Sequence, residues 1–134
     1  MNRIEEDVRA FLLAQVSATS GRLFIGGAKD PSAYIPNKAV FIMQHGGAAP
    51  HGYMDGGNTD YRRVRVQVQV RSETDDYAGG KSLAESVLAA LHRAHFGSPG
   101  YVRVTVDTSA PLYWGRGEKE HHDWSVNATI EVED

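Results

Sequence analysis

Hydrophobic and polar residues alternate most regularly in the middle of the chain, between positions 61 and 71. Valine occupies positions 64, 66, 68 and 70, and arginine or glutamine occupies the positions between them. Because successive side chains of a β-strand point to opposite faces, this period of two makes one apolar and one polar face. In a helix the same valines would be spread around every side. The pattern predicts a central antiparallel strand with helices packed on its valine face. The open polar face would carry Arg63, Arg65, Gln67, Gln69 and Arg71.

Two segments have the spacing of amphipathic helices. The first, near residues 4–16, places Ile4, Val8 and Leu12 on one side, with acidic residues in its first turn. The second follows the central strand, with an apolar stripe that includes Tyr77, Ala84, Val87, Leu88, Leu91 and His95. Gly79 and Gly80 lie at its start, and each costs about 1 kcal/mol relative to alanine. The second helix is therefore expected either to fray at its start or to begin only near Lys81.

The remaining apolar segments predict shorter strands. Residues 23–25 suggest an edge strand, residues 39–43 a buried strand, and residues 111–114 a short extended piece. Residues 102–106 and 124–132 alternate like the central strand. The economical packing is an α+β fold: a four- to five-stranded, mostly antiparallel sheet with two helices on one face. A single domain covering residues 1–134 is expected.

The segment from His45 to Asp60 interrupts this pattern. It contains five glycines, one proline and few apolar side chains. These features predict a long, flexible loop, and long loops inside compact domains are usually functional or disordered.

Composition narrows the function classes. The chain has 134 residues, 41% of them hydrophobic and 23% charged, which is ordinary for a globular protein. A net charge of -3 does not favour nucleic acid or anionic membranes as partners. The absence of cysteine excludes disulfides, thiolate nucleophiles and cysteine zinc sites. No apolar run approaches the roughly 20 residues of a membrane span, and the first residues do not resemble a signal peptide. We therefore expect a cytosolic protein without membrane contact.

The sequence contains no convincing motif for a phosphate-binding, metal or catalytic site. Gly80-Lys81-Ser82 opens a helix like a phosphate-binding loop, but Asp75 stands where that motif needs glycine. The six histidines do not form a recognisable ligand set, and we expect them to be solvated in loops and at helix ends. No Gly-x-Ser-x-Gly nucleophile motif occurs. The expectation is a protein with no catalytic residue, metal or cofactor.

The arginines of the central strand admit two interpretations. They could form a stripe that binds a nucleic-acid backbone. Acidic residues flank them, however, and Glu131 and Asp107 are expected to face them across the sheet. Cross-strand ion pairs on a solvated face are therefore the favoured interpretation. Tyr113, Trp114 and Arg116 form a separate candidate interface, because tyrosine, tryptophan and arginine are enriched in protein contacts.

Four segments, in their order and spacing, resemble the tail terminator proteins of long-tailed bacteriophages, also called tail-completion or minor capsid proteins. The first is AVFIMQHGG at residues 39–47, followed by a loop. The second is VQVQVR at residues 66–71, followed by the helical residues 84–92. The third is APLYWGRGEK at residues 110–119, and the last is DWSVNATIEV at residues 123–132.

This resemblance implies a structural virion protein, not an enzyme. It implies a homo-oligomeric ring, hexameric in most members, that caps the tail tube and joins it to the head connector. DNA would pass through its lumen without specific binding, and the partners would be the tail tube protein and the connector or stopper protein. The protein would be assembled in the host cytoplasm and lie at the head-proximal end of the tail.

In such a ring the polar sheet face would line the lumen or contact a neighbouring subunit. The predicted loop would contact the tail tube or connector, and its candidate contact residues are His45, His51, Tyr53, Met54, Asp55 and Asn58. Two alternatives stay open. One is another head-tail connector or tail-tube subunit with the same small fold, and the other is a small nucleic-acid-binding module.

Overall fold

The computed structural model describes residues 4–16, 23–26, 38–52, 60–92, 94, 96, 100–116 and 121–133. Only the backbone is described for residues 45, 47–52, 60, 61 and 116. The elements, in chain order, are α1 (Ile4–Gln15), β1 (Leu23–Ile25), β2 (Ala39–Gly52), β3 (Asp60–Ser72), α2 (Tyr77–Leu91), β4 (Tyr101–Val106), β5 (Leu112–Arg116) and β6 (His122–Glu133).

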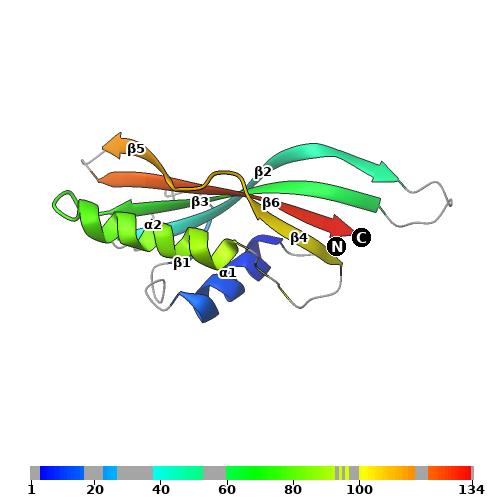
Figure 1. Ribbon diagram of the computed structural model, residues 1–134, viewed down its shortest axis with the longest axis horizontal. Helices are drawn as coiled ribbons and strands as arrows, with labels where there is room; N and C mark the ends of the chain where they lie inside the picture. Colours follow the sequence, from blue (N-terminus) through cyan, green and yellow to red (C-terminus); the bar gives the residue numbers. More distant parts are fainter. Residues whose placement is uncertain are drawn as a thin grey trace.

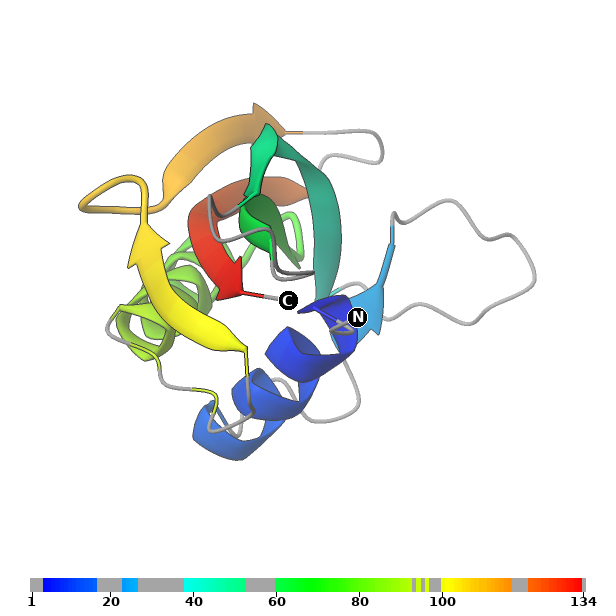
Figure 2. The same cartoon turned by 90° about the vertical axis from the view of Figure 1, so that its right-hand side faces the viewer.

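The described strands form one six-stranded sheet with both helices on one side, as Figure 1 shows. Its strand order is β1-β2-β3-β6-β4, and β5 also pairs with β6. Only β1 and β2 run parallel. The sheet is strongly twisted when viewed from its end (Figure 2). The predicted α+β fold is confirmed, with slightly more strands than the four or five expected.

The predicted central strand is the middle of this sheet. β3 pairs with β2 on one side and with β6 on the other, both antiparallel. Its valines at 64, 66, 68 and 70 are at most 5% exposed. They share one hydrophobic core with Ile4, Val8 and Leu12 of α1 and with Leu83, Ala84, Val87 and Leu91 of α2. Burial of these two helix faces places the core on one side of the sheet and leaves the other side for contacts.

The segment predicted as a long loop is largely strand. β2 continues to Gly52 and β3 begins at Asp60, so the two form a long hairpin. The register shifts between Gln44 and Gly47, and again between Ala48 and His51. These irregularities accommodate a positive φ of 59° at Gly46 and the proline at position 50, which has no N–H to donate to the ladder. The predicted loop was therefore wrong over residues 45–52, because glycine and proline there mark bulges in a strand, whereas residues 53–59 lie outside the described residues.

The second helix begins earlier than Lys81. Asp76 caps it, accepting a hydrogen bond from the backbone N–H of Gly79 at 3.0 Å. Gly80 is buried, and a Cβ on it would lie 2.4 Å from both Ser72 Oγ and Trp124 Cζ3. The glycine that lowers helix propensity therefore lets α2 pack closely against β3 and β6. The helix ends at Leu91, and the predicted stripe was wrong at Tyr77, which is 45% exposed; His95 lies outside the described residues.

None of the described helices is long and apolar enough to cross a membrane.

Candidate functional site

The side of the sheet turned away from the helices, here called the outer face, carries all five residues predicted for the polar face. In the register of β3 with its neighbours, side chains that pair directly share a face. Arg63 therefore lies beside Glu131, Arg65 beside Thr129, and Gln67 beside Asn127. Gln69 lies beside Ser125, and Arg71 beside Asp123. On the outer face, the arginines and amides of β3 thus lie beside carboxylates, hydroxyls and one amide of β6.

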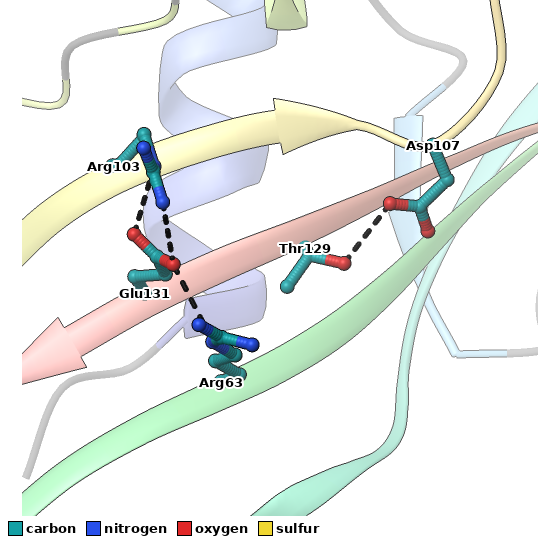
Figure 3. A network of polar contacts seen from close by, with 5 residues as sticks. All are labelled: Arg63, Arg103, Asp107, Thr129 and Glu131. Atoms are coloured by element: carbon teal, nitrogen blue, oxygen red, sulfur yellow. Dashed lines mark hydrogen bonds and ion pairs between the residues drawn. The ribbon is translucent and has the colours of Figure 1, made fainter.

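One end of the outer face is organised by Glu131, which is only 5% exposed. Arg103 of β4 donates two hydrogen bonds of 2.9 Å to its carboxylate. Arg63 of β3 approaches from the opposite side, with its Nε 3.4 Å from Oε1. Figure 3 shows this carboxylate on β6 between the guanidinium groups of two neighbouring strands. The predicted cross-strand ion pair of Glu131 is confirmed, and Arg103 is the partner that sequence reasoning missed.

A second acidic group lies next to this network. The hydroxyl of Thr129 donates a hydrogen bond of 3.0 Å to Asp107, just beyond the end of β4 (Figure 3). Thr129 is also the register partner of Arg65. The Asp107 carboxylate therefore lies on the same face as Arg65, separated from it by one strand.

The other end of the outer face pairs Arg71 with Asp123. Partial burial raises the pKa of Asp123 above its ordinary value of 3.8, although Arg71 opposes the shift. Burial likewise lowers the pKa of Arg71, opposed by Asp123. The Arg71 guanidinium also lies 5.4 Å from the centre of the Phe41 ring, which stacks on Phe24. Phe41 pairs with Gln69, so its buried ring belongs to the outer face. This face was predicted to be polar, but it contains an aromatic ring that is 1% exposed.

A small hollow separates these two ends. It has a volume of about 190 Å³ and is lined by Gln67, Gln69, Trp114 and Ser125. The indole N–H of Trp114 donates a hydrogen bond of 2.7 Å to Ser125 Oγ. Ser125 is fully buried, whereas Trp114 is 65% exposed. The hydrogen bond holds a large aromatic ring in one orientation at the edge of the outer face.

Trp114 belongs to a group of exposed apolar side chains around β5, here called the aromatic patch, in which Leu112 and Trp114 lie on the outer-face side of β5 and Tyr77 and Tyr113 on its helix side. Its members are Tyr77, Leu112, Tyr113 and Trp114, each between 38% and 65% exposed. The ring of Tyr77 lies edge-on to that of Tyr113, with their centroids 5.4 Å apart. The patch thus combines two candidate interface residues with Tyr77, which the helical stripe had placed in the core. Only the backbone of Arg116, the third candidate, is described, opposite His122.

His122 is a buried residue that contacts Tyr113 of the aromatic patch. It is 6% exposed, and its Nε2 donates to the carbonyl of Thr74 at 2.9 Å. In a neutral ring this leaves Nδ1 to accept the hydroxyl hydrogen of Tyr113, at 2.8 Å. The expectation of a solvated loop histidine was wrong here, because β6 begins at His122 and pairs with β5. The alternation of 124–132, extended two residues back, could have placed this side chain on the core face.

The candidate loop contacts are divided by the hairpin. His45 and His51 belong to β2. Tyr53, Met54, Asp55 and Asn58 lie outside the described residues. Within the described part of the chain, no three histidine or acidic side chains converge as a metal site would require. The described outer face can bind by charge, hydrogen bonding and aromatic contact.

Comparison with known families matches residues 31–134 to the model of the bacteriophage tail terminator proteins. The chain belongs to this family. The fold is similar to that of a chain in the "Virion of native gene transfer agent (GTA) particle", with a TM-score of 0.73. That likeness covers 98% of this chain and 95% of the other at 18% sequence identity. Comparison with curated proteins gave no match.

Membership in the tail terminator family makes the protein a structural component of a phage tail. The family consists of structural virion proteins and is not known for catalysis. The resemblance inferred from four short segments is therefore confirmed at the level of the family. The outer face and the aromatic patch are the surfaces on which such a component could contact its neighbours.

Proposed function

We propose that this tail terminator forms a closed ring, of six subunits, that caps the finished tail tube at its head-proximal end. The ring joins the tube to the head connector and surrounds the path of the DNA. The subunits assemble on the tube in the host cytoplasm, and no cofactor takes part. The observation that carries this proposal is the exposure of large apolar side chains around β5, which we propose as a subunit contact.

The aromatic patch has the properties of a protein contact. Tyrosine and tryptophan dominate the binding energy of many interfaces because they bury a large area with few rotatable bonds. Here the Trp114 indole is already fixed on Ser125, and the Tyr113 hydroxyl is bonded to His122. Little side-chain freedom is left to be lost on association. In a ring the patch would contact a different surface of the next subunit, since cyclic contacts are heterologous.

The outer face suits the lumen of such a ring. A surface along which DNA slides should be hydrated but should not hold phosphate groups by accumulated positive charge. Across the described outer face, arginines alternate with carboxylates and amides, and the whole chain has a net charge of -3. This balance is consistent with passage of DNA without specific binding.

The hairpin of β2 and β3 supplies the proposed contact with the tube or connector. Its strands reach Gly52 and Asp60, which pair in register. The four candidate contact residues between them are Tyr53, Met54, Asp55 and Asn58. A pair of long strands is a rigid support for such a contact, because each strand restrains the other through its hydrogen bonds.

The proposal is tested by imaging virions made with and without the protein. The mass of the purified protein is measured first, alone and with the tail tube protein, to find whether a ring forms before or on the tube. Tails assembled without the protein should lack a terminal ring, vary in length and fail to join heads. Tails of uniform length that join heads normally without it would contradict the proposal, as would labelled protein located away from the junction.

A further inference from the structure

The carboxylate of Glu131 lies between two arginines of the outer face, Arg63 and Arg103. The Glu131 side chain is 7% exposed, whereas the side chains of its partners Arg63 and Arg103 are 55% and 66% exposed. A buried carboxylate is costly unless opposite charge surrounds it, and here two guanidinium groups supply that charge. In return, both exposed arginines have a fixed anion directly beneath them.

The arrangement uses the hydrogen-bonding geometry that arginine would otherwise offer to a phosphate. The planar guanidinium group binds carboxylates and phosphates with the same pair of parallel N–H groups. Arg103 already directs Nε and one terminal nitrogen to the two oxygens of Glu131. Arg63 directs its Nε to the same carboxylate. A DNA phosphate approaching this end of the face therefore meets guanidinium groups with N–H donors already directed to Glu131, and one of their two positive charges is offset by that carboxylate.

A second carboxylate, that of Asp107, lies on the same face as Arg65, one strand away. It is held by the hydroxyl of Thr129, the residue that lies beside Arg65 in the register. Two arginines of β3 and one of β4 thus share the outer face with Glu131 of β6, the strand between them, and with Asp107. Without those carboxylates, the three would form a cationic surface of the kind that captures nucleic-acid backbones.

We infer that Glu131 and Asp107 together mask a latent phosphate-binding surface made by Arg63, Arg103 and Arg65, and so keep the outer face from holding DNA. Its importance for DNA passage rests on the proposed function, in which this face lines the channel. The masking itself is a property of the isolated subunit. A network that served only to attach β4 to the sheet would affect stability and would leave DNA affinity unchanged.

The test measures binding of purified protein to a short labelled DNA duplex across a series of salt concentrations. Glu131→Gln retains the shape of the side chain but removes its charge. The variant should bind duplex DNA about tenfold more tightly than the original protein at low salt. The affinity should also fall more steeply with salt, by about 0.9 in the logarithmic slope for each arginine that gains a phosphate.

The matched control is Glu85→Gln, which makes the same charge change at an exposed position on α2, across the sheet from the outer face. It should leave affinity within about twofold of the original. Adding Arg63→Ala and Arg103→Ala to Glu131→Gln should abolish the gain. A folded Glu131→Gln protein that binds no better than the Glu85→Gln control would overturn the inference.

A second variant applies if Glu131→Gln does not fold. Asp107→Asn removes an exposed charge from the same surface and should also tighten DNA binding, through Arg65. Unchanged affinity in that variant would then refute the masking. Because these measurements use isolated protein, their failure is distinguishable from failure of the ring proposal, which is decided by imaging tails.

Discussion

Gly80 shows how a single missing side chain determines the packing of a helix. It lies in the first turns of α2, where glycine is unfavourable for helix formation by about 1 kcal/mol relative to alanine. Its Cα faces Ser72 of β3 and Trp124 of β6, both buried. Glycine is nevertheless required here, because a Cβ at this position would push the helix away from the sheet.

We predict that Gly80→Ala destabilises the protein by about 1–3 kcal/mol, although alanine is the better helix former. The added methyl group would meet Ser72 Oγ and Trp124 Cζ3 at 2.4 Å. Urea denaturation followed by tryptophan fluorescence measures the change. Ser82→Ala is the control, since it raises helix propensity at an exposed position of α2. A Gly80→Ala protein as stable as the original would show that α2 can shift freely.

Asp123 gives a prediction for pH. Because burial raises its pKa in the folded state, the folded protein favours the protonated carboxyl. Its contribution to stability is therefore fully present below the ordinary pKa of 3.8 and is lost as pH rises through the higher folded pKa.

We predict that the free energy of unfolding of the original protein, minus that of Asp123→Asn, decreases as pH rises through this window and is constant above it. Denaturation at a series of pH values measures the difference, in which the other carboxyl groups cancel. A difference that increases with pH would mean that the attraction of Arg71 outweighs burial. The sign of the slope thus decides between the two opposing effects.

At the scale of elements, β4 is an edge strand that depends on β6. Its backbone pairs with β6, with one register shift near Tyr101, and its side chain Arg103 reaches Glu131. The hydroxyl of Tyr101 also donates to Asp7 of α1, which ties the start of β4 to the first helix. These contacts join an edge strand to both layers of the fold.

We predict that Arg103→Ala loosens β4 locally without unfolding the sheet. The loss should be about 1 kcal/mol, because Glu131 keeps Arg63 as a partner while most of the Arg103 side chain is solvated. Amide hydrogen exchange should speed up in β4 by roughly fivefold and stay unchanged in the paired centre of β3. Equal acceleration in both strands would indicate a global loss of stability instead.

At the scale of the whole molecule, the helices occupy one side of the sheet and leave the outer face and the aromatic patch for contacts. A further groove of about 450 Å³ lies between the end of α2 and β4, beside the exposed Val102. A subunit with contact surfaces at different places can form a closed ring by repeating one heterologous contact. The aromatic patch is the surface at which loss of one side chain should matter most.

We predict that Trp114→Ala weakens self-association by about 2 kcal/mol or more for each contact, or roughly thirtyfold. The subunit itself should lose only about 1 kcal/mol of stability, from the hydrogen bond to Ser125. Sedimentation with the tail tube protein measures assembly, and Val102→Ala is a control for the loss of another exposed apolar side chain. If Trp114→Ala assembles normally while folded, the patch is not the ring contact.

The sequence alone determined the central strand, the α+β class and the placement of both helices on one side. Each of these depends on periodicity, which follows directly from where successive side chains point. The order of the segments also identified the family, and the alternation in β3 and β6 identified the outer face. The extent of β2 was missed because glycine and proline signal bulges and turns alike.

Only the tertiary structure decided which carboxylate meets which arginine. A shift of one residue in the register of β3 and β6 would turn Glu131 to the opposite face from Arg63, so that contact depends on alignment between residues far apart in the chain. Gly80 is another example, because the need for glycine there arises from the close approach of Trp124. Tyr77 is a third, because it was expected in the core and lies in the aromatic patch. Local periodicity states which way a side chain points, whereas packing between distant segments decides what it meets.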